Sequence, residues 1–217
     1  MKKMYLFLSM VTVFALALSA CAPAAPVATE PPAPTAVPPT AVPPTATEAP
    51  PAVGSAEHPI KVLFVPSVDA NVIVTGGEVM AAALKEATGL NFEVVVPTSY
   101  AATIEEMCAS PTDTMAFIPA FGYVLANDLC GVDVAFKAVR RGWGVYWTMI
   151  VVARDSDIDS IDDLNGKKFA FPDAGSTSGY LVPSVMLKDA GVTVGEELEA
   201  GGHPQAVRAV YTGEADL

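Results

Sequence analysis

Residues 168–190 read Lys-Phe-Ala-Phe-Pro-Asp-Ala-Gly-Ser-Thr-Ser-Gly-Tyr-Leu-Val-Pro-Ser-Val-Met-Leu-Lys-Asp-Ala. The run Lys168–Phe171 is mostly apolar and is ended by a proline, which predicts a buried strand. Residues 179–190 have helical spacing and stop before Gly191, which predicts a helix. A strand that leads through a short loop into a helix is typical of a parallel sheet covered by helices.

The same alternation of strand and helix precedes this stretch. The predicted strands are 60–65, 91–96 and 114–118, each followed by a proline, and a further pair, 134–139 and 145–153, flanks a turn at Arg141-Gly142. The predicted helices are 78–88, 101–109, 121–129 and a short capped one at 160–164. The pattern predicts an α/β fold with mainly parallel sheets, in which ligands bind in the loops at the carboxyl ends of the strands.

The loop at residues 172–180 is the most informative of these loops. It places Ser176, Thr177 and Ser178 between two glycines at the start of a helix. Free backbone N–H groups and the positive end of the helix dipole favour an anion there, and hydroxyl groups add donors. The loop lacks the Gly-Lys-[Ser/Thr] ending of a nucleotide P-loop, so ATP is not indicated. The alternative is a flexible Gly/Ser loop in which one serine caps the helix.

Five segments together resemble one protein family. They are Pro-Thr-Ser-Tyr-Ala (97–101), Ile-Pro-Ala-Phe-Gly-Tyr-Val-Leu-Ala (118–126), Ile-Asp-Asp-Leu-Asn-Gly-Lys-Lys-Phe-Ala-Phe (161–171), Gly-Ser-Thr-Ser-Gly-Tyr-Leu-Val-Pro (175–183) and Gly-Gly-His-Pro-Gln-Ala-Val (201–207). In this order they are similar to the phosphate-, phosphite- and phosphonate-binding proteins of bacterial ABC importers. The resemblance covers nearly all of residues 59–217, and it implies the type II periplasmic-binding-protein fold.

The resemblance implies two α/β lobes, 59–150 and 151–217, that close on a ligand in the cleft between them. It also implies the ligand-binding residues, which are Ser176, Thr177, Ser178, Tyr100, Tyr123 and His203. Each has a plainer alternative: the tyrosines could pack under their helices, and His203 could cap the helix that follows it. Members of the family are longer than this chain, so we expect the second lobe and the return crossover to the first to be incomplete.

The function that the resemblance implies is that of a solute-binding component of an ABC importer. A monomer would bind a phosphonate, phosphite or phosphate anion and deliver it to a permease and ATPase complex. The alternatives are a sensory lipoprotein without a transport role and a binder of another small anion, such as a sulfonate. Ser176, His203 and Asp173 could be imagined as a hydrolytic triad, but Thr177 takes the middle position where a nucleophile elbow has serine. We therefore expect no enzyme activity, catalytic residue or cofactor.

The N-terminus predicts export and lipid anchoring. Residues 1–21 have a basic start, an apolar core and small residues before Cys21, as in a lipoprotein signal peptide with a lipid-carrying cysteine. Residues 22–58 are rich in Pro, Thr and Ala, and this composition is typical of a disordered linker. The expected location is the outer face of the cytoplasmic membrane or the periplasm, with the membrane contacted through the lipid anchor only.

The charge and the cysteines of the chain indicate which partners, disulfides and metal sites to expect. The chain has 24 acidic and 12 basic residues and a net charge of -12, which disfavours nucleic acid as a partner. Cys108 and Cys130 would face an oxidising compartment after export, so a disulfide between them is expected. Metal-ligand spacing is absent around these cysteines, so no metal site is expected.

Overall fold

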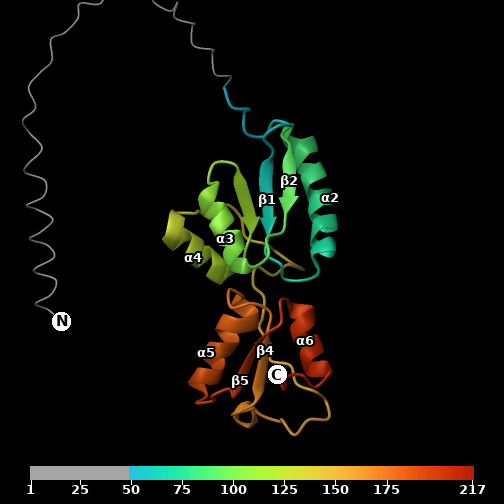
Figure 1. Ribbon diagram of the computed structural model, residues 1–217, viewed down its shortest axis with the longest axis vertical. Helices are drawn as coiled ribbons and strands as arrows, with labels where there is room; N and C mark the ends of the chain where they lie inside the picture. Colours follow the sequence, from blue (N-terminus) through green and yellow to red (C-terminus); the bar gives the residue numbers. More distant parts are fainter. Residues whose placement is uncertain (1–48) are drawn as a thin grey trace, which may run out of the picture. The chain divides into compact units, whose positions relative to one another are not determined.

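The structure is a computed structural model that describes residues 49–217 (Figure 1). The signal peptide, the lipobox Cys21 and most of the linker predicted above lie outside the described residues. The described part contains two parallel sheets, one in its first half and one in its second. Within it, no helix is long and apolar enough to cross a membrane.

The first sheet has three parallel strands in the order β2-β1-β3. They are β1 (Ile60–Phe64), β2 (Phe92–Val95) and β3 (Thr114–Phe117). The central strand carries two fully buried apolar residues, Val62 and Leu63, which are both 0% exposed. All three strands were predicted, and each ends shortly before a proline, which cannot donate a ladder hydrogen bond.

Three helices follow these strands: α2 (Ala70–Thr88), α3 (Tyr100–Ala109) and α4 (Ala120–Cys130). All were predicted, but α2 begins well before the expected residue 78. The Asp69 carboxylate accepts a hydrogen bond from the Asn71 N–H and so caps an earlier start. Gly77 allows α2 to lie close to the sheet, because a Cβ there would be 2.7 Å from Val94.

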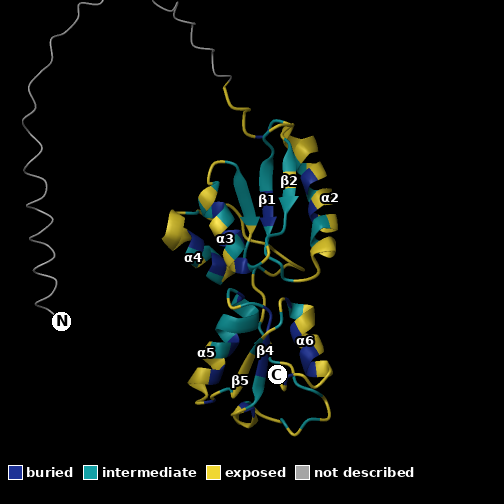
Figure 2. Ribbon diagram, in the orientation of Figure 1, coloured by how far each residue is buried: buried dark blue, intermediate teal, exposed yellow. Residues whose placement is uncertain are grey.

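The second sheet pairs β4 (Lys168–Phe171) with β5 (Glu196–Glu199). Both faces of β4 are covered, because Phe169 and Phe171 pack in one apolar cluster with Leu187, while Ala170 belongs to another. Figure 2 colours most of β4 as buried. Strand β5 was not predicted. Its sequence, Glu-Glu-Leu-Glu, has a single apolar side chain and gives no strand signal.

The helical segments around this sheet agree in part with the prediction. The short 3₁₀ helix η1 (Ile161–Leu164) has the expected cap, in which Ser160 and Asp163 bond to each other's backbone. The helix expected from residue 179 begins as a π-helical turn, η2 (Thr177–Leu181), and continues as α5 (Val182–Asp189). The last helix, α6 (His203–Tyr211), packs on the other face of β4. Beyond it, residues 215–217 lie along β4, where the Ala170 N–H donates to the Leu217 carbonyl at 2.7 Å.

The strands predicted at 134–139 and 145–153 are wrong. The turn between them is present, with positive φ at Arg141 and Gly142, but the pairing stops at one bridge between Arg140 and Trp143. A strand requires a hydrogen-bonded neighbour, and within the described residues these segments have none. Several of their large side chains are exposed, with Phe136 at 90% and Trp147 at 79%.

A disulfide joins Cys108 of α3 to Cys130 at the end of α4. The bridge closes a loop with a sequence separation of 22 residues. In the chain-entropy model, we expect reduction to lower the free energy of unfolding by about 3 kcal/mol. Urea unfolding with and without a reductant measures this difference, and a Cys108→Ser/Cys130→Ser variant should not respond to the reductant. Equal stability of the reduced and oxidised chains would contradict the prediction.

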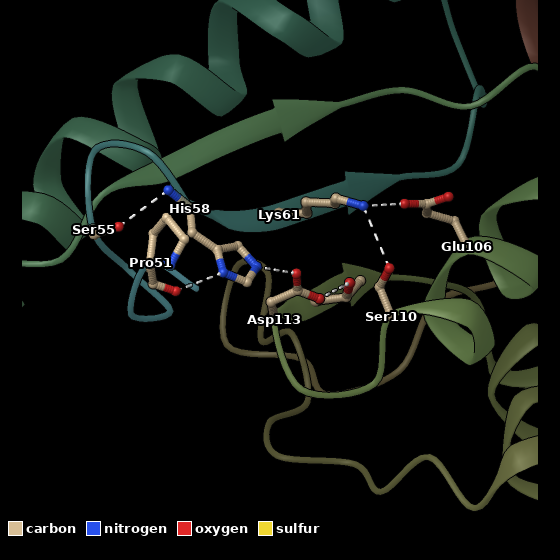
Figure 3. A network of polar contacts seen from close by, with 8 residues as sticks. Pro51, Ser55, His58, Lys61, Glu106, Ser110 and Asp113 are labelled. Atoms are coloured by element: carbon tan, nitrogen blue, oxygen red, sulfur yellow. Dashed lines mark hydrogen bonds and ion pairs between the residues drawn. The ribbon is translucent and has the colours of Figure 1, made fainter. Parts of the chain in front are cut away.

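A polar network holds the start of the described chain to the first sheet (Figure 3). The His58 ring lies between two acceptors: Nε2 is 2.6 Å from the Asp113 carboxylate, and Nδ1 is 3.2 Å from the Pro51 carbonyl. Nearby, the Lys61 ammonium pairs with Glu106. The hydrogen bond to Asp113 raises the pKa of His58, and the same bond lowers the pKa of Asp113.

These shifts predict how the pair affects stability at different pH. The His58 contribution is full below its unfolded pKa of about 6.5 and is lost as the pH rises through its higher folded pKa. The Asp113 contribution is lost only when the pH falls through the lowered pKa of that carboxyl. We therefore expect the stability difference between the wild type and His58→Gln to shrink between about pH 6 and about pH 9. Urea unfolding at both pH values measures it, and a constant difference would contradict the assignment.

Candidate functional site

The loop that follows β4 is shaped by Asp173. Its Oδ1 accepts a hydrogen bond from the Gly175 N–H at 2.7 Å, and its carbonyl accepts one from the Ser176 N–H at 2.9 Å. An aspartate that bonds to the backbone two residues ahead makes an Asx turn. The turn brings the chain directly into η2, so the three hydroxyl residues stand at the beginning of the helical segment.

Ser176 is the buried member of the three, at 2% exposure. Its Oγ accepts a hydrogen bond from the Gly179 N–H at 3.1 Å and lies 3.4 Å from Nε2 of His203. Ser176 is therefore the cap of η2, as the plainer alternative expected. A hydroxyl that accepts one hydrogen bond still has a proton to donate, so the cap role leaves its donor capacity intact.

Thr177 and Ser178 bond to different parts of the chain. The Thr177 Oγ1 accepts a hydrogen bond from the Phe121 N–H, in the first turn of α4, at 2.8 Å. The Ser178 carbonyl accepts one from the Thr148 hydroxyl. The loop is thus bonded both to a helix of the first sheet and to the segment that connects the two sheets.

Tyr100 and His203 lie against the same loop. The Tyr100 side chain is buried, at 3% exposure, and its N–H donates to Oδ2 of Asp173 at 3.1 Å. Burial raises the pKa of Tyr100, while a hydrogen bond with Ser176 acts in the opposite direction. Burial lowers the pKa of His203, so its ring is neutral at neutral pH. The backbone N–H of His203 donates a hydrogen bond to the Ser67 carbonyl at 3.0 Å.

His203 and Tyr123 differ in how they lie relative to the loop. His203 is the first residue of α6, and Gly202 holds the cap position, so the alternative of a histidine cap is wrong. Tyr123 lies half-buried in the first turn of α4, where its N–H donates to the Pro119 carbonyl. Among the described residues its hydroxyl has no hydrogen bond, and it is not brought onto the hydroxyl triplet as Tyr100 and His203 are.

The site also contains groups that the sequence analysis did not assign to it. They are the Asp173 carboxylate, the Phe121 N–H, the Ser67 carbonyl and the Thr148 hydroxyl. The Asp-Ala-Gly spacing is a signal for the Asx turn and could have found Asp173. The backbone groups leave no trace in the sequence, because any residue type supplies them.

The starts of several helices meet at this loop. Tyr100 begins α3, Phe121 lies in the first turn of α4, and His203 begins α6, while Ser176 caps η2. Each helix start has N–H groups that lack a partner inside the helix, and each lies at the positive end of a helix dipole. Together they produce a local field that favours an anion in a chain whose net charge is -12.

The hydrolytic triad is not formed. Both Asp173 oxygens accept hydrogen bonds from backbone N–H groups, and the pKa of His203 responds to burial without a carboxylate contribution. Ser176 and His203 are close, but the group that would orient the histidine as a base is directed elsewhere. The described residues also contain no group of three or more His, Cys, Asp or Glu that could hold a metal ion.

A cavity of about 250 Å³ adjoins the loop at Ser178, Gly179 and His203. Its other lining residues are mostly apolar and include Trp147, Met149, Phe169 and Val207. A larger depression of about 470 Å³ lies between α2 and β2 and is lined by none of the candidate residues. Of these two cavities, the smaller one is next to the hydroxyl loop.

Gly179 is fixed by close packing. A Cβ there would lie 2.3 Å from Pro172 and 3.0 Å from the His203 ring, so an alanine requires the loop to shift. We expect Gly179→Ala to lower the free energy of unfolding by about 1–3 kcal/mol. Gly76→Ala is the matched control, because its Cβ would meet nothing within 4 Å and the change should stabilise α2 by up to about 1 kcal/mol. Urea unfolding of both variants tests this packing, and equal effects would refute it.

Comparison with known proteins places this geometry in a family. The model of the family described as "ABC transporter, phosphonate, periplasmic substrate-binding protein" matches residues 62–217. The phosphate-import protein PhnD of Mycolicibacterium smegmatis is 31% identical over 147 residues, which cover 61% of this chain and 46% of that protein. The chain therefore spans about half the length of this relative.

Two solved structures have the same fold. PhnD1 from Prochlorococcus marinus, solved in complex with methylphosphonate, matches with a TM-score of 0.55 and 18% identity over 72% of this chain and 61% of that one. A binding protein component of an ABC phosphonate transporter from Pseudomonas aeruginosa matches with a TM-score of 0.61 and 22% identity over 73% and 55%. The type II periplasmic-binding-protein fold expected from the sequence is thus confirmed for the part present. The chain belongs to the family of periplasmic substrate-binding proteins of phosphonate ABC transporters.

Proposed function

We propose that this chain is the solute-binding part of an ABC importer and that it binds a phosphonate, phosphite or phosphate anion at the loop after β4. The lobes would be residues 59–150 and 151–217, attached through the linker 22–58 to a lipid on Cys21. The observation that carries the proposal is the meeting of four helix starts at a loop with three hydroxyl groups.

The hydrogen-bond donors of the loop suit a tetrahedral oxyanion. Ser176 and Thr177 each accept a hydrogen bond from a backbone N–H and keep a hydroxyl proton to donate. The Ser178 hydroxyl adds a third donor. Hydrogen bonds to a charged group are worth about 1.5–3 kcal/mol each, so a few such donors are enough for useful affinity.

The remaining residues have supporting roles in this proposal. Burial keeps the Tyr100 phenol protonated and able to donate. The neutral His203 ring, as the Nε2–H tautomer, would donate to Ser176 and direct the serine proton toward the anion. Tyr123 would reach the ligand from the first turn of α4. These roles involve binding alone, without a covalent step.

The relatives support the same reading. One is named a phosphate-import protein, and one solved neighbour was crystallised with methylphosphonate. These are proteins of transport, which agrees with a chain that binds a solute and passes it to a permease and ATPase. Their names differ in the anion, so the ligand of this chain must be measured.

Isothermal titration of the purified full chain tests the proposal. The panel is phosphate, phosphite, methylphosphonate, aminoethylphosphonate and, as a sulfur anion, sulfate. We expect micromolar or tighter binding of one phosphorus anion, and a loss of about tenfold or more in Ser176→Ala and in Thr177→Ala.

Thr193→Ala is the matched control, since the hydrogen bonds of this exposed threonine involve its backbone N–H and carbonyl, and both remain in the variant. It should bind as the wild type does. A folded chain that binds no member of the panel would refute the oxyanion assignment. Binding of sulfate alone would replace the phosphorus anion by a sulfur one.

A further inference from the structure

The Asp173 carboxylate forms hydrogen bonds to two different parts of the chain. One carboxylate oxygen accepts from the Gly175 N–H within the loop, and the other accepts from the Tyr100 N–H at the start of α3. Tyr100 follows β2 in the first sheet, and Asp173 follows β4 in the second. The carboxylate therefore bridges the two halves of the candidate site.

The packing around the bridge is tight. A Cβ on Gly175 would lie 2.8 Å from the Tyr100 Cβ and 3.1 Å from Oδ1 of Asp173. Only a residue without a side chain allows the loop to approach Tyr100 so closely. The bridge and this contact together determine where the Tyr100 ring lies relative to Ser176.

Among residues 49–217, Asp173 is the acceptor of the Tyr100 N–H. It is the first N–H of α3 and has no partner within the helix, while the capping Ser99 hydroxyl accepts from Ala102 instead. A carboxylate at this position also interacts favourably with the helix dipole. An asparagine would offer one carbonyl oxygen in place of two acceptors, so it could satisfy only one of the two N–H groups.

We propose that Asp173 is a positioning residue of the anion site, which holds the hydroxyl loop and Tyr100 together without touching the ligand. This inference rests on the proposed function for its ligand. It assigns to a negatively charged residue a role that favours the binding of an anion. The role follows from geometry, because both of its oxygens are engaged by backbone N–H groups.

The direction of the change in anion affinity on removal of the Asp173 carboxylate distinguishes a bridging role from a purely electrostatic one. If Asp173 influenced the anion only through its charge, removal of the charge would relieve repulsion and tighten binding. If it acts as a bridge, removal frees the loop from α3 and weakens binding. We expect Asp173→Asn to weaken the binding of methylphosphonate or phosphate by about tenfold.

Titration calorimetry on the full chain measures this change. Asp155→Asn is the matched control, because Asp155 is exposed and its side chain has no hydrogen bond among the described residues. Asp155→Asn removes the same charge at another position and should leave the affinity for the anion unchanged. Equal or tighter binding by Asp173→Asn would overturn the proposal.

A second variant keeps the charge and disturbs the contact. Gly175→Ala places a methyl group against Tyr100 while the carboxylate remains. We expect it to weaken anion binding to a similar degree. Wild-type affinity in this variant would overturn the proposal even if Asp173→Asn failed to fold.

Amide hydrogen exchange tests the bridge without a ligand. In the unliganded chain, Asp173→Asn should accelerate exchange at the Tyr100 N–H, the Gly175 N–H or both, while the Ala102 N–H, bonded to Ser99, stays protected. Unchanged exchange at both amides would overturn the bridge. If the wild type binds no anion, the proposed function fails, and the exchange result still decides whether Asp173 joins the two parts.

Discussion

The unpaired N–H groups at the starts of α3 and α4 are the constraint on which the site depends. A helix cannot satisfy the N–H groups of its own first turn, and burying them without acceptors is costly. In this chain the acceptors come from a distant loop, because Asp173 accepts from Tyr100 and Thr177 accepts from Phe121. One loop of nine residues therefore caps two helices that belong to the other sheet.

The position of that loop follows from the packing of β4. Phe169 and Phe171 face one apolar cluster and Ala170 faces the other, so the strand is buried on both faces and its carboxyl end is held firmly. The difference in size matters: the two phenylalanines pack with η1 and α5, while the small Ala170 lets α6 approach. That approach brings His203, at the start of α6, to within 3.4 Å of Ser176.

Much of this arrangement could be read from local sequence, and the failures have physical causes. Prolines after β1, β2 and β3 mark strand ends reliably, because they remove a ladder donor. The segments 134–139 and 145–153 have strand-like composition but no strand beside them in the described part of the chain, and pairing is not a local property. In the site, Ser176, Tyr100 and His203 come together as the family resemblance implies, whereas the Phe121 N–H and the Ser67 carbonyl could not be found from side-chain identity.

The hydroxyl groups of the loop combine two tasks because of how a hydroxyl bonds. Thr177 accepts the Phe121 N–H through a lone pair, and this fixes the oxygen and limits the directions in which its proton can point. Ser176 does the same with the Gly179 N–H. If the proposed function holds, the hydrogen bonds that assemble the protein would orient donors in advance and reduce the entropy lost when an anion binds. The same oxygens would then act as structural caps and as ligand contacts, so that the plain and the functional interpretations of the loop are compatible.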